Sequence, residues 1–153
     1  MSDIIHLLAD VLIIPVALCA AYAFLWKIPR AQKPRAYSLL IVTGVTTYLL
    51  AQLIAAVWQP DAARPFIEEG VKAGALYLPN PGFPSDHALF CTFLTLGVWF
   101  ITRQKKLAIA MGIMTVLVCI GRVLALVHTP LDVIGGVIIA CLGAVWLLQY
   151  PHP

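Results

Sequence analysis

The chain has 153 residues, of which 61% are hydrophobic and 11% are charged, and its formal net charge is +3. A soluble domain would carry about a quarter charged residues, so this composition excludes a soluble globular protein and indicates an integral membrane protein. We expect a single domain over residues 1–153, with the membrane bilayer and no nucleic acid among its partners.

Two apolar segments, over residues 4–26 and 37–58, begin the chain. Each is long enough to cross the hydrocarbon as a helix, which takes about 20 residues. The first contains Pro15, which predicts a kink. It also contains Asp10, which either faces the helix bundle or lies near the outer interface in water.

The proline-rich stretch over residues 59–84 connects these segments to the rest of the chain. Within it, residues 66–78 are predicted to form a short helix on the membrane surface. The run from Asn80 to Pro84 predicts a turn. Ser85 and Asp86 follow this turn, and both are favourable N-cap residues for the next helix.

Three further apolar segments, over residues 86–102, 107–127 and 131–149, complete a predicted all-α bundle of about five transmembrane helices. No alternating pattern typical of membrane strands is present, so helices must satisfy the backbone hydrogen bonds. The cysteines all fall inside apolar segments without metal-ligand spacing, so we interpret them as packing residues rather than disulfides or metal ligands: Cys19, Cys91, Cys119 and Cys141.

Basic residues concentrate in two loops of the predicted bundle: Lys27, Arg30, Lys33 and Arg35, and then Arg103, Lys105 and Lys106. Because basic loops stay cytoplasmic, the N-terminus is predicted outside and the C-terminus in the cytoplasm. The other basic residues then fall on the outer side, against this bias: Arg64, Lys72 and Arg122. All acidic residues map to the outer side or to the outer half of a helix.

Several of these outer residues suit phosphoryl transfer. Arg64 and Arg122 can each bind phosphate oxygens in a bidentate way. His128 is a candidate nucleophile, and Asp132 can fix its tautomer and stabilise its positive charge. His87, near the N-terminus of a helix that favours an anion, is a candidate general acid. A phosphohistidine formed in this way requires neither a metal nor a cofactor.

Each feature also has a simpler interpretation when it is taken alone. A single arginine at an interface often extends its charged end to water, and Ser85 can be only a helix cap. His128 can be an interfacial residue, and Thr129 and Asp132 can form a cap. Two histidines with carboxylates can also bind zinc. The location of every motif on one predicted side of the membrane favours a shared site.

The motifs resemble those of the type 2 phosphatidic acid phosphatase family of membrane phosphatases, which are K-x6-R-P, P-S-G-H and S-R-x5-H-x3-D. The second corresponds to Pro84-Ser85-Asp86-His87, and the third to Gly121-Arg122 followed by His128 and Asp132. The first keeps Arg64-Pro65 but has Val57 at its lysine position. The motif-bearing core covers about residues 57–136.

This resemblance implies the role of each site residue. His128 would be the nucleophile, Asp132 its partner and His87 the acid, while the phosphate would be bound by Arg64, Ser85 and Arg122. Lys72 is a candidate substitute for the missing lysine. Asp86 either contacts the substrate or only caps its helix, and Gly121 keeps a backbone N–H that can donate.

Asp86 and the run Arg64-Pro65-Phe66 are similar to the undecaprenyl-diphosphatase branch of the bacitracin-resistance type. We therefore expect a metal-independent phosphatase that converts a polyprenyl diphosphate of cell wall biosynthesis to the monophosphate at the outer face of the cell (inner) membrane. The alternatives are a phosphatase of phosphatidylglycerol phosphate or phosphatidic acid, and a non-catalytic phospholipid-binding or transport protein. Because the family usually has six spanning helices, a homo-oligomer that completes the bundle is also an expectation.

Overall fold

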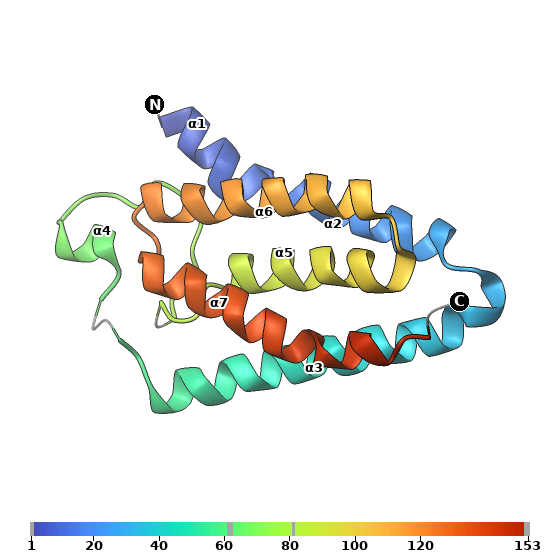
Figure 1. Ribbon diagram of the computed structural model, residues 1–153. Helices are drawn as coiled ribbons and strands as arrows, with labels where there is room; N and C mark the ends of the chain where they lie inside the picture. The colour runs from blue at the N-terminus through green and yellow to red at the C-terminus, as the bar shows by residue number, and fades with distance from the viewer. Residues whose placement is uncertain (1, 61–62, 81, 152–153) are drawn as a thin grey trace.

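The computed structural model describes residues 2–60, 63–80 and 82–151, and the predicted all-α fold is confirmed (Figure 1). Four segments are long and apolar enough to cross a membrane: Asp3–Lys27, Arg30–Val57, Lys105–Leu124 and Pro130–Gln149. A shorter apolar helix covers Asp86–Thr102. These five segments agree with the five apolar stretches that the sequence predicts, and the chain is an integral membrane protein.

The first two spans are irregular at their ends. The first consists of α1 (Ser2–His6), a π-helical turn η1 (Leu7–Val11), α2 (Ile13–Tyr22) and a second π-helical turn η2 (Ala23–Lys27). The turn η1 ends four residues before Pro15, which has no N–H to donate to the carbonyl of Val11. The second span is a short 3₁₀ turn η3 (Arg30–Gln32) followed by α3 (Lys33–Val57).

The remaining spans follow the long loop and its short helix α4 (Pro65–Glu68). They are α5 (Asp86–Gly97) with η4 (Val98–Thr102), α6 (Lys105–Leu124), and α7 (Pro130–Gly143) with η5 (Ala144–Gln149). Helix α5 lies between α6 and α7 in the middle of the bundle and also packs on α2 and α3 (Figure 1).

Close helix contacts bring the start of α5 against the start of α7. The Ser85 amide donates to the Asp132 carbonyl at 3.0 Å. One turn further along α7, a Cβ on Gly136 would lie 2.7 Å from the Ser85 carbonyl oxygen, so only glycine allows this approach. Small residues at helix interfaces serve this purpose in membranes. As a result, the ends of two helices that carry motif residues lie together.

The predicted surface helix over residues 66–78 is wrong, because helix α4 ends at Glu68. Gly70 has φ +67°, which favours glycine and stops a right-handed helix. The Gly70 amide donates to Ile67 and the Val71 amide donates to Phe66, which is the hydrogen-bond pattern of a Schellman motif. The chain then continues without helix over residues 71–80, a segment that we call the strip. The strip carries the Leu78 and Asn80 oxygens toward the site.

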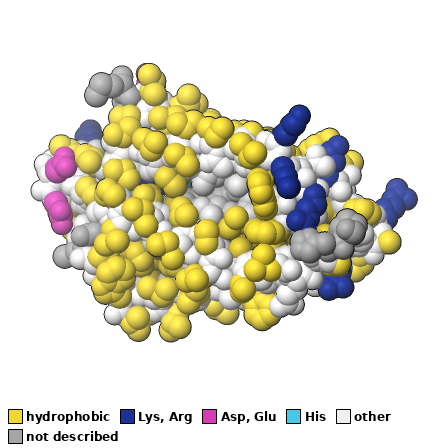
Figure 2. All heavy atoms as spheres, in the orientation of Figure 1, with side chains coloured by type: hydrophobic (Ala, Val, Ile, Leu, Met, Phe, Trp, Pro, Cys, Tyr) yellow, Lys and Arg dark blue, Asp and Glu magenta, His cyan; other side chains and the backbone are white. Residues whose placement is uncertain are grey.

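Side chains on the surface are sorted along the length of the bundle. Figure 2 shows hydrophobic side chains over much of the visible face, most of the visible Lys and Arg toward one end, and Asp and Glu at the other. The basic residues of the two loops are largely exposed, as are most of the large hydrophobic residues of α3. An apolar belt between two polar ends is the surface that a bilayer requires.

Candidate active site

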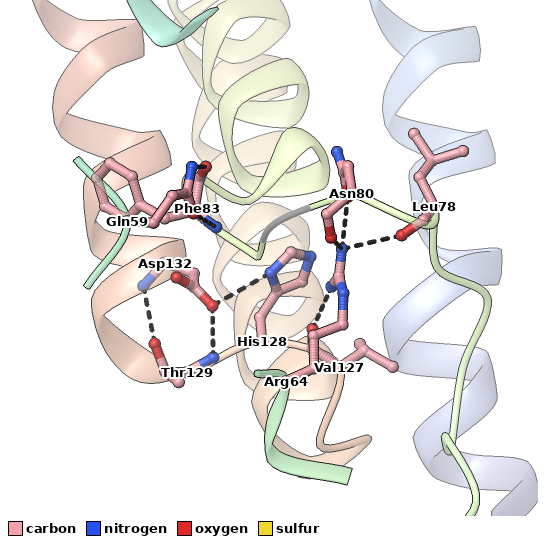
Figure 3. Close-up of polar contacts among 9 residues, drawn as sticks. All are labelled: Gln59, Arg64, Leu78, Asn80, Phe83, Val127, His128, Thr129 and Asp132. Atoms are coloured by element: carbon pink, nitrogen blue, oxygen red, sulfur yellow. Dashed lines mark hydrogen bonds and ion pairs between the residues drawn. The ribbon is translucent and has the colours of Figure 1, made fainter. Parts of the chain in front are cut away.

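His128 and Asp132 form a buried pair at the junction of α6 and α7. Pro130 begins α7 and Thr129 is its N-cap residue, with the Thr129 hydroxyl accepting from the Asp132 amide at 3.3 Å. Asp132 Oδ2 accepts from the Thr129 amide at 2.8 Å and lies 3.4 Å from His128 Nδ1 (Figure 3). The capping box therefore holds the carboxylate toward the imidazole, so the capping role and the orienting role of Asp132 are compatible.

The surroundings of His128 favour its neutral form. Its side chain is 5% exposed, and burial lowers its pKa below the usual 6.5. The positive charges of Arg122 and Arg64 also lower this pKa, whereas Asp132 opposes the shift. Nδ1 is buried, close enough to Asp132 for an ion pair but outside hydrogen-bond geometry. Nε2, the other nitrogen, is therefore the one that can attack a ligand.

Arg64 lies on the other side of His128, as Figure 3 shows, but backbone and side-chain oxygens of the protein accept hydrogen bonds from its guanidinium. Its Nη1 donates to the Val127 carbonyl, and its Nη2 contacts the Leu78 carbonyl at 3.1 Å and Asn80 Oδ1 at 2.6 Å. Burial lowers the pKa of Arg64, and the carboxylates of Asp132 and Asp86 oppose this shift. Arg64 thus fixes the loop ahead of α5 to the residue that precedes His128.

Ser85 supplies a buried hydroxyl without a partner. It stands at the N-cap position of α5, as the sequence predicts, but its side chain makes no capping hydrogen bond. The side chain is fully buried, and Oγ has no hydrogen-bond partner. Because buried hydroxyls normally have partners, this oxygen is available for a ligand at the helix N-terminus.

His87 and Asp86, in the first turn of α5, line a cavity of about 610 Å³ that Asn80 and Gln52 also line. His87 is half-buried and lies close enough to Arg122 and His128 for their charges to act on it. The two histidines predicted to share a site therefore lie at the same end of the bundle.

Arg122 is 1% exposed in the last turn of α6, and it pairs with the first span. Its Nη1 donates to Asp10 Oδ1 at 2.8 Å, while its Nε is buried without a partner. Of the two positions considered for Asp10, the structure shows the one inside the bundle, with 8% of its side chain exposed.

Lys72 is exposed in the strip after α4. It does not line the cavity that His87 and Asp86 share. Asn80, by contrast, is a site residue that the sequence analysis does not predict, although its position at the start of the turn that leads to Ser85 is a signal that could have found it. Within the described part of the chain, no group of three or more His, Cys, Asp or Glu is arranged to hold a metal ion.

Comparison with known protein families gives a match over most of the chain. Residues 33–153 match the family model described as the PAP2 superfamily, and this range contains Arg64, Ser85, His87, Arg122, His128 and Asp132. Neither the curated proteins nor the solved structures gave a match. The matched range covers most of the chain and three motif regions that the fold brings to one end, so the chain belongs to the PAP2 superfamily, whose function is of the lipid phosphate phosphatase type.

Proposed function

We propose that this chain is a phosphatase that hydrolyses a lipid phosphate through a phosphohistidine on His128. The observation that carries the proposal is the buried pair of His128 and Asp132, with Nδ1 and Oδ2 3.4 Å apart. The pair lies within the fields of two arginines. Such a setting provides a neutral nucleophile, a carboxylate to stabilise the imidazolium that forms, and positive charge for the phosphate.

In the first step, His128 Nε2 attacks phosphorus and the bond from phosphorus to the lipid-side oxygen breaks. His87 gives a proton to that leaving oxygen, and Asp132 stabilises the positive charge on His128. In the second step, water attacks the phosphohistidine and the P–N bond breaks. His87 takes the proton of that water, and inorganic phosphate leaves with His128 neutral again.

Donors without partners around His128 would bind the phosphate. The Ser85 hydroxyl and the Arg122 Nε are both buried and unpaired. The N-terminus of α5 adds backbone N–H groups and a favourable dipole for an anion. In this arrangement Arg64 acts on the phosphate mainly through its charge, because carbonyl oxygens take both of its Nη atoms.

An apolar groove next to the site supports a lipid substrate. It has a volume of about 350 Å³, lies between α5, α6 and α7, and is lined largely by apolar side chains. Val133, the residue after Asp132, lines one end of it, and Ile120 lies two residues before Arg122. A lipid whose phosphate is at His128 can therefore place its first apolar carbons in this groove.

Within this class, we propose a polyprenyl diphosphate as the substrate and the outer membrane face as the side of the reaction. The similarity of Asp86 and the Arg64-Pro65-Phe66 run to the undecaprenyl-diphosphatase branch supports this choice. A cavity of about 740 Å³ beside Arg64, lined also by Gln59, Tyr77 and Asn80, offers polar groups for the second phosphate.

A second function, binding of a phosphorylated lipid without turnover, is favoured by one observation. Both Nη atoms of Arg64 are occupied by carbonyl oxygens, and Val57 stands at the position of the family lysine. Of the two cations expected at the phosphate, Arg64 thus already donates to protein oxygens, and the lysine is absent. This function predicts saturable binding that persists when His128 is replaced.

The deciding experiment measures phosphate release by the detergent-purified protein in EDTA. Undecaprenyl diphosphate, phosphatidylglycerol phosphate and phosphatidic acid would be compared for the wild type, for His128→Ala and for Cys141→Ala. Cys141 is an exposed residue of α7 and serves as the control. We expect release by the wild type and Cys141→Ala but not by His128→Ala, and an acid-labile phosphoenzyme in the active proteins only. Binding of all three lipids with no release by any protein would support the non-catalytic function.

A further inference from the structure

Asp10 is joined to the site by an ion pair that crosses the bundle. It lies on the π turn η1 of the first span, and its Oδ1 accepts from Arg122 Nη1 at 2.8 Å. Both side chains are largely buried, with 8% and 1% exposed. Asp10 precedes the residues that match the PAP2 model, which begin at 33. One member of the pair, Asp10, therefore comes from a part of this chain outside the matched range, and the other, Arg122, lies within it.

Gly121 explains how the two residues can approach each other. A Cβ on Gly121 would lie 2.6 Å from the Ala9 nitrogen and 2.7 Å from the Leu8 carbonyl carbon. Because both are backbone atoms, no side chain at position 121 fits without moving η1. The glycine that replaces the serine of the third motif thus makes room for the turn that carries Asp10, and π turns often occur at functional sites.

The ion pair leaves the Nε of the Arg122 guanidinium without a partner. A guanidinium can bind an oxyanion through the edge formed by Nε and Nη2, and Asp10 contacts Nη1, which lies outside this edge. The Nε is buried and has no hydrogen-bond partner. A buried charged donor without a partner is rare in proteins, and it indicates that a ligand completes its contacts.

We propose that Asp10 is a positioning residue that holds Arg122 by Nη1 and turns its Nε and Nη2 edge toward the phosphate of the substrate. This inference rests on the phosphate-binding role proposed for Arg122. The carboxylate also keeps the buried guanidinium paired when no phosphate is bound, which limits the cost of its desolvation.

The second oxygen of Asp10 extends this effect to the other arginine. Oδ2 accepts from the Leu76 amide at 2.9 Å, which fixes the strip after α4 to the first span. Two residues further on, the Leu78 carbonyl contacts Arg64 at 3.1 Å. One carboxylate therefore fixes the supports of both Arg122 and Arg64.

The opposite role would be competition, in which the Asp10 carboxylate occupies the place of the phosphate and must be displaced. The two roles predict opposite signs for the removal of the charge. Positioning predicts weaker oxyanion binding in Asp10→Asn, whereas competition predicts tighter binding. The unpaired Nε favours positioning, because a competitor would be expected to occupy the edge that the phosphate uses.

The test compares wild type, Asp10→Asn and Asp10→Glu, with Glu69→Gln as the control because Glu69 is an exposed carboxylate of the outer loop. The readouts are KM and kcat with phosphatidic acid or undecaprenyl diphosphate, and the thermal stabilisation by orthovanadate as a phosphate mimic. We expect Asp10→Asn to raise KM and the vanadate Kd about tenfold or more, as for loss of a hydrogen bond to a charged group. Asp10→Glu should recover part of the loss, and Glu69→Gln should match the wild type.

The Arg122→Lys background separates this effect on phosphate binding from a general loss of folding. A lysine has no Nε and Nη2 edge to aim, so Asp10→Asn should change the vanadate Kd little in that background. Tighter or unchanged vanadate binding in Asp10→Asn alone would overturn the inference while leaving wild-type turnover, and thus the proposed function, intact. A wild type that neither releases phosphate nor binds vanadate would overturn both.

Discussion

At the scale of single residues, the state of His128 sets a testable pH dependence. His128 must be neutral to attack phosphorus, and burial lowers its pKa below 6.5. The neutral form then persists to lower pH than for a free histidine, so the acid limb of kcat/KM should lie below pH 6.5. A pH series of initial rates in EDTA measures this limb. An acid limb above 6.5 would contradict the lowered pKa.

The carboxylate partner of His128 gives the same experiment a control. Asp132 raises the pKa of His128 against the effect of burial, so Asp132→Asn should move the acid limb to lower pH still. The maximal rate should fall about 10²-fold or more, because the imidazolium loses its stabilising charge. An acid limb that does not move would show that Asp132 does not act on the pKa of His128, and a shift to higher pH would give its effect the opposite sign.

Individual motif residues could be identified from sequence because their chemistry is unusual in an apolar chain. Arg122, His128 and Asp132 stand out at a membrane for this reason, and the structure places them at one end of the bundle. The partner of Arg122 could not be found in the same way. Asp10 is 112 residues away along the chain, and only the packing of η1 on Gly121 brings it to the guanidinium.

At the scale of elements, the contact between α7 and α5 should limit both stability and activity. In Gly136→Ala, the new Cβ would meet the Ser85 carbonyl oxygen at 2.7 Å. Helix α7 must then move away from the start of α5, which should cost about 1–3 kcal/mol of stability, as overpacking does. The amide contact from Ser85 to Asp132 should weaken, and phosphate release should fall with it.

The matched control for this substitution is Gly44→Ala in α3. There the new Cβ would lie 3.4 Å from the edge of the Phe93 ring, which is ordinary contact with a side chain that can adjust. Thermal unfolding in detergent, followed with phosphate release, should separate the two variants. Equal melting temperatures for Gly136→Ala, Gly44→Ala and the wild type would contradict the close packing of α5 and α7.

The elements differ in how far sequence could predict them. The spans were predicted well, because the thickness of the hydrocarbon sets the length of an apolar helix. The helix over residues 66–78 was predicted wrongly, because the backbone conformation of Gly70 decides where α4 ends. The π turn η1 was not predicted either, since it depends on how the first span packs against α6.

At the scale of the whole molecule, the charges divide the bundle into two ends. The loop residues Arg30 and Lys106 are exposed. Figure 2 shows most of the visible Lys and Arg toward one end of the bundle. The starts of α5 and α7, next to His87 and His128, lie toward the opposite end with the long loop (Figure 1). Because basic loops stay in the cytoplasm, this division predicts a site that faces outward. The orientation decides which leaflet supplies the lipid substrate.

Single-cysteine labelling in sealed cells would test this orientation. With the native cysteines replaced by alanine, Glu69→Cys in the loop near the site should react with a membrane-impermeant maleimide, because Glu69 is exposed. Lys106→Cys, also exposed, should react only after the membrane is permeabilised. The cysteine-free protein sets the background. The reverse pattern would place His128 at the cytoplasmic face, where the same chemistry would act on lipids of the inner leaflet.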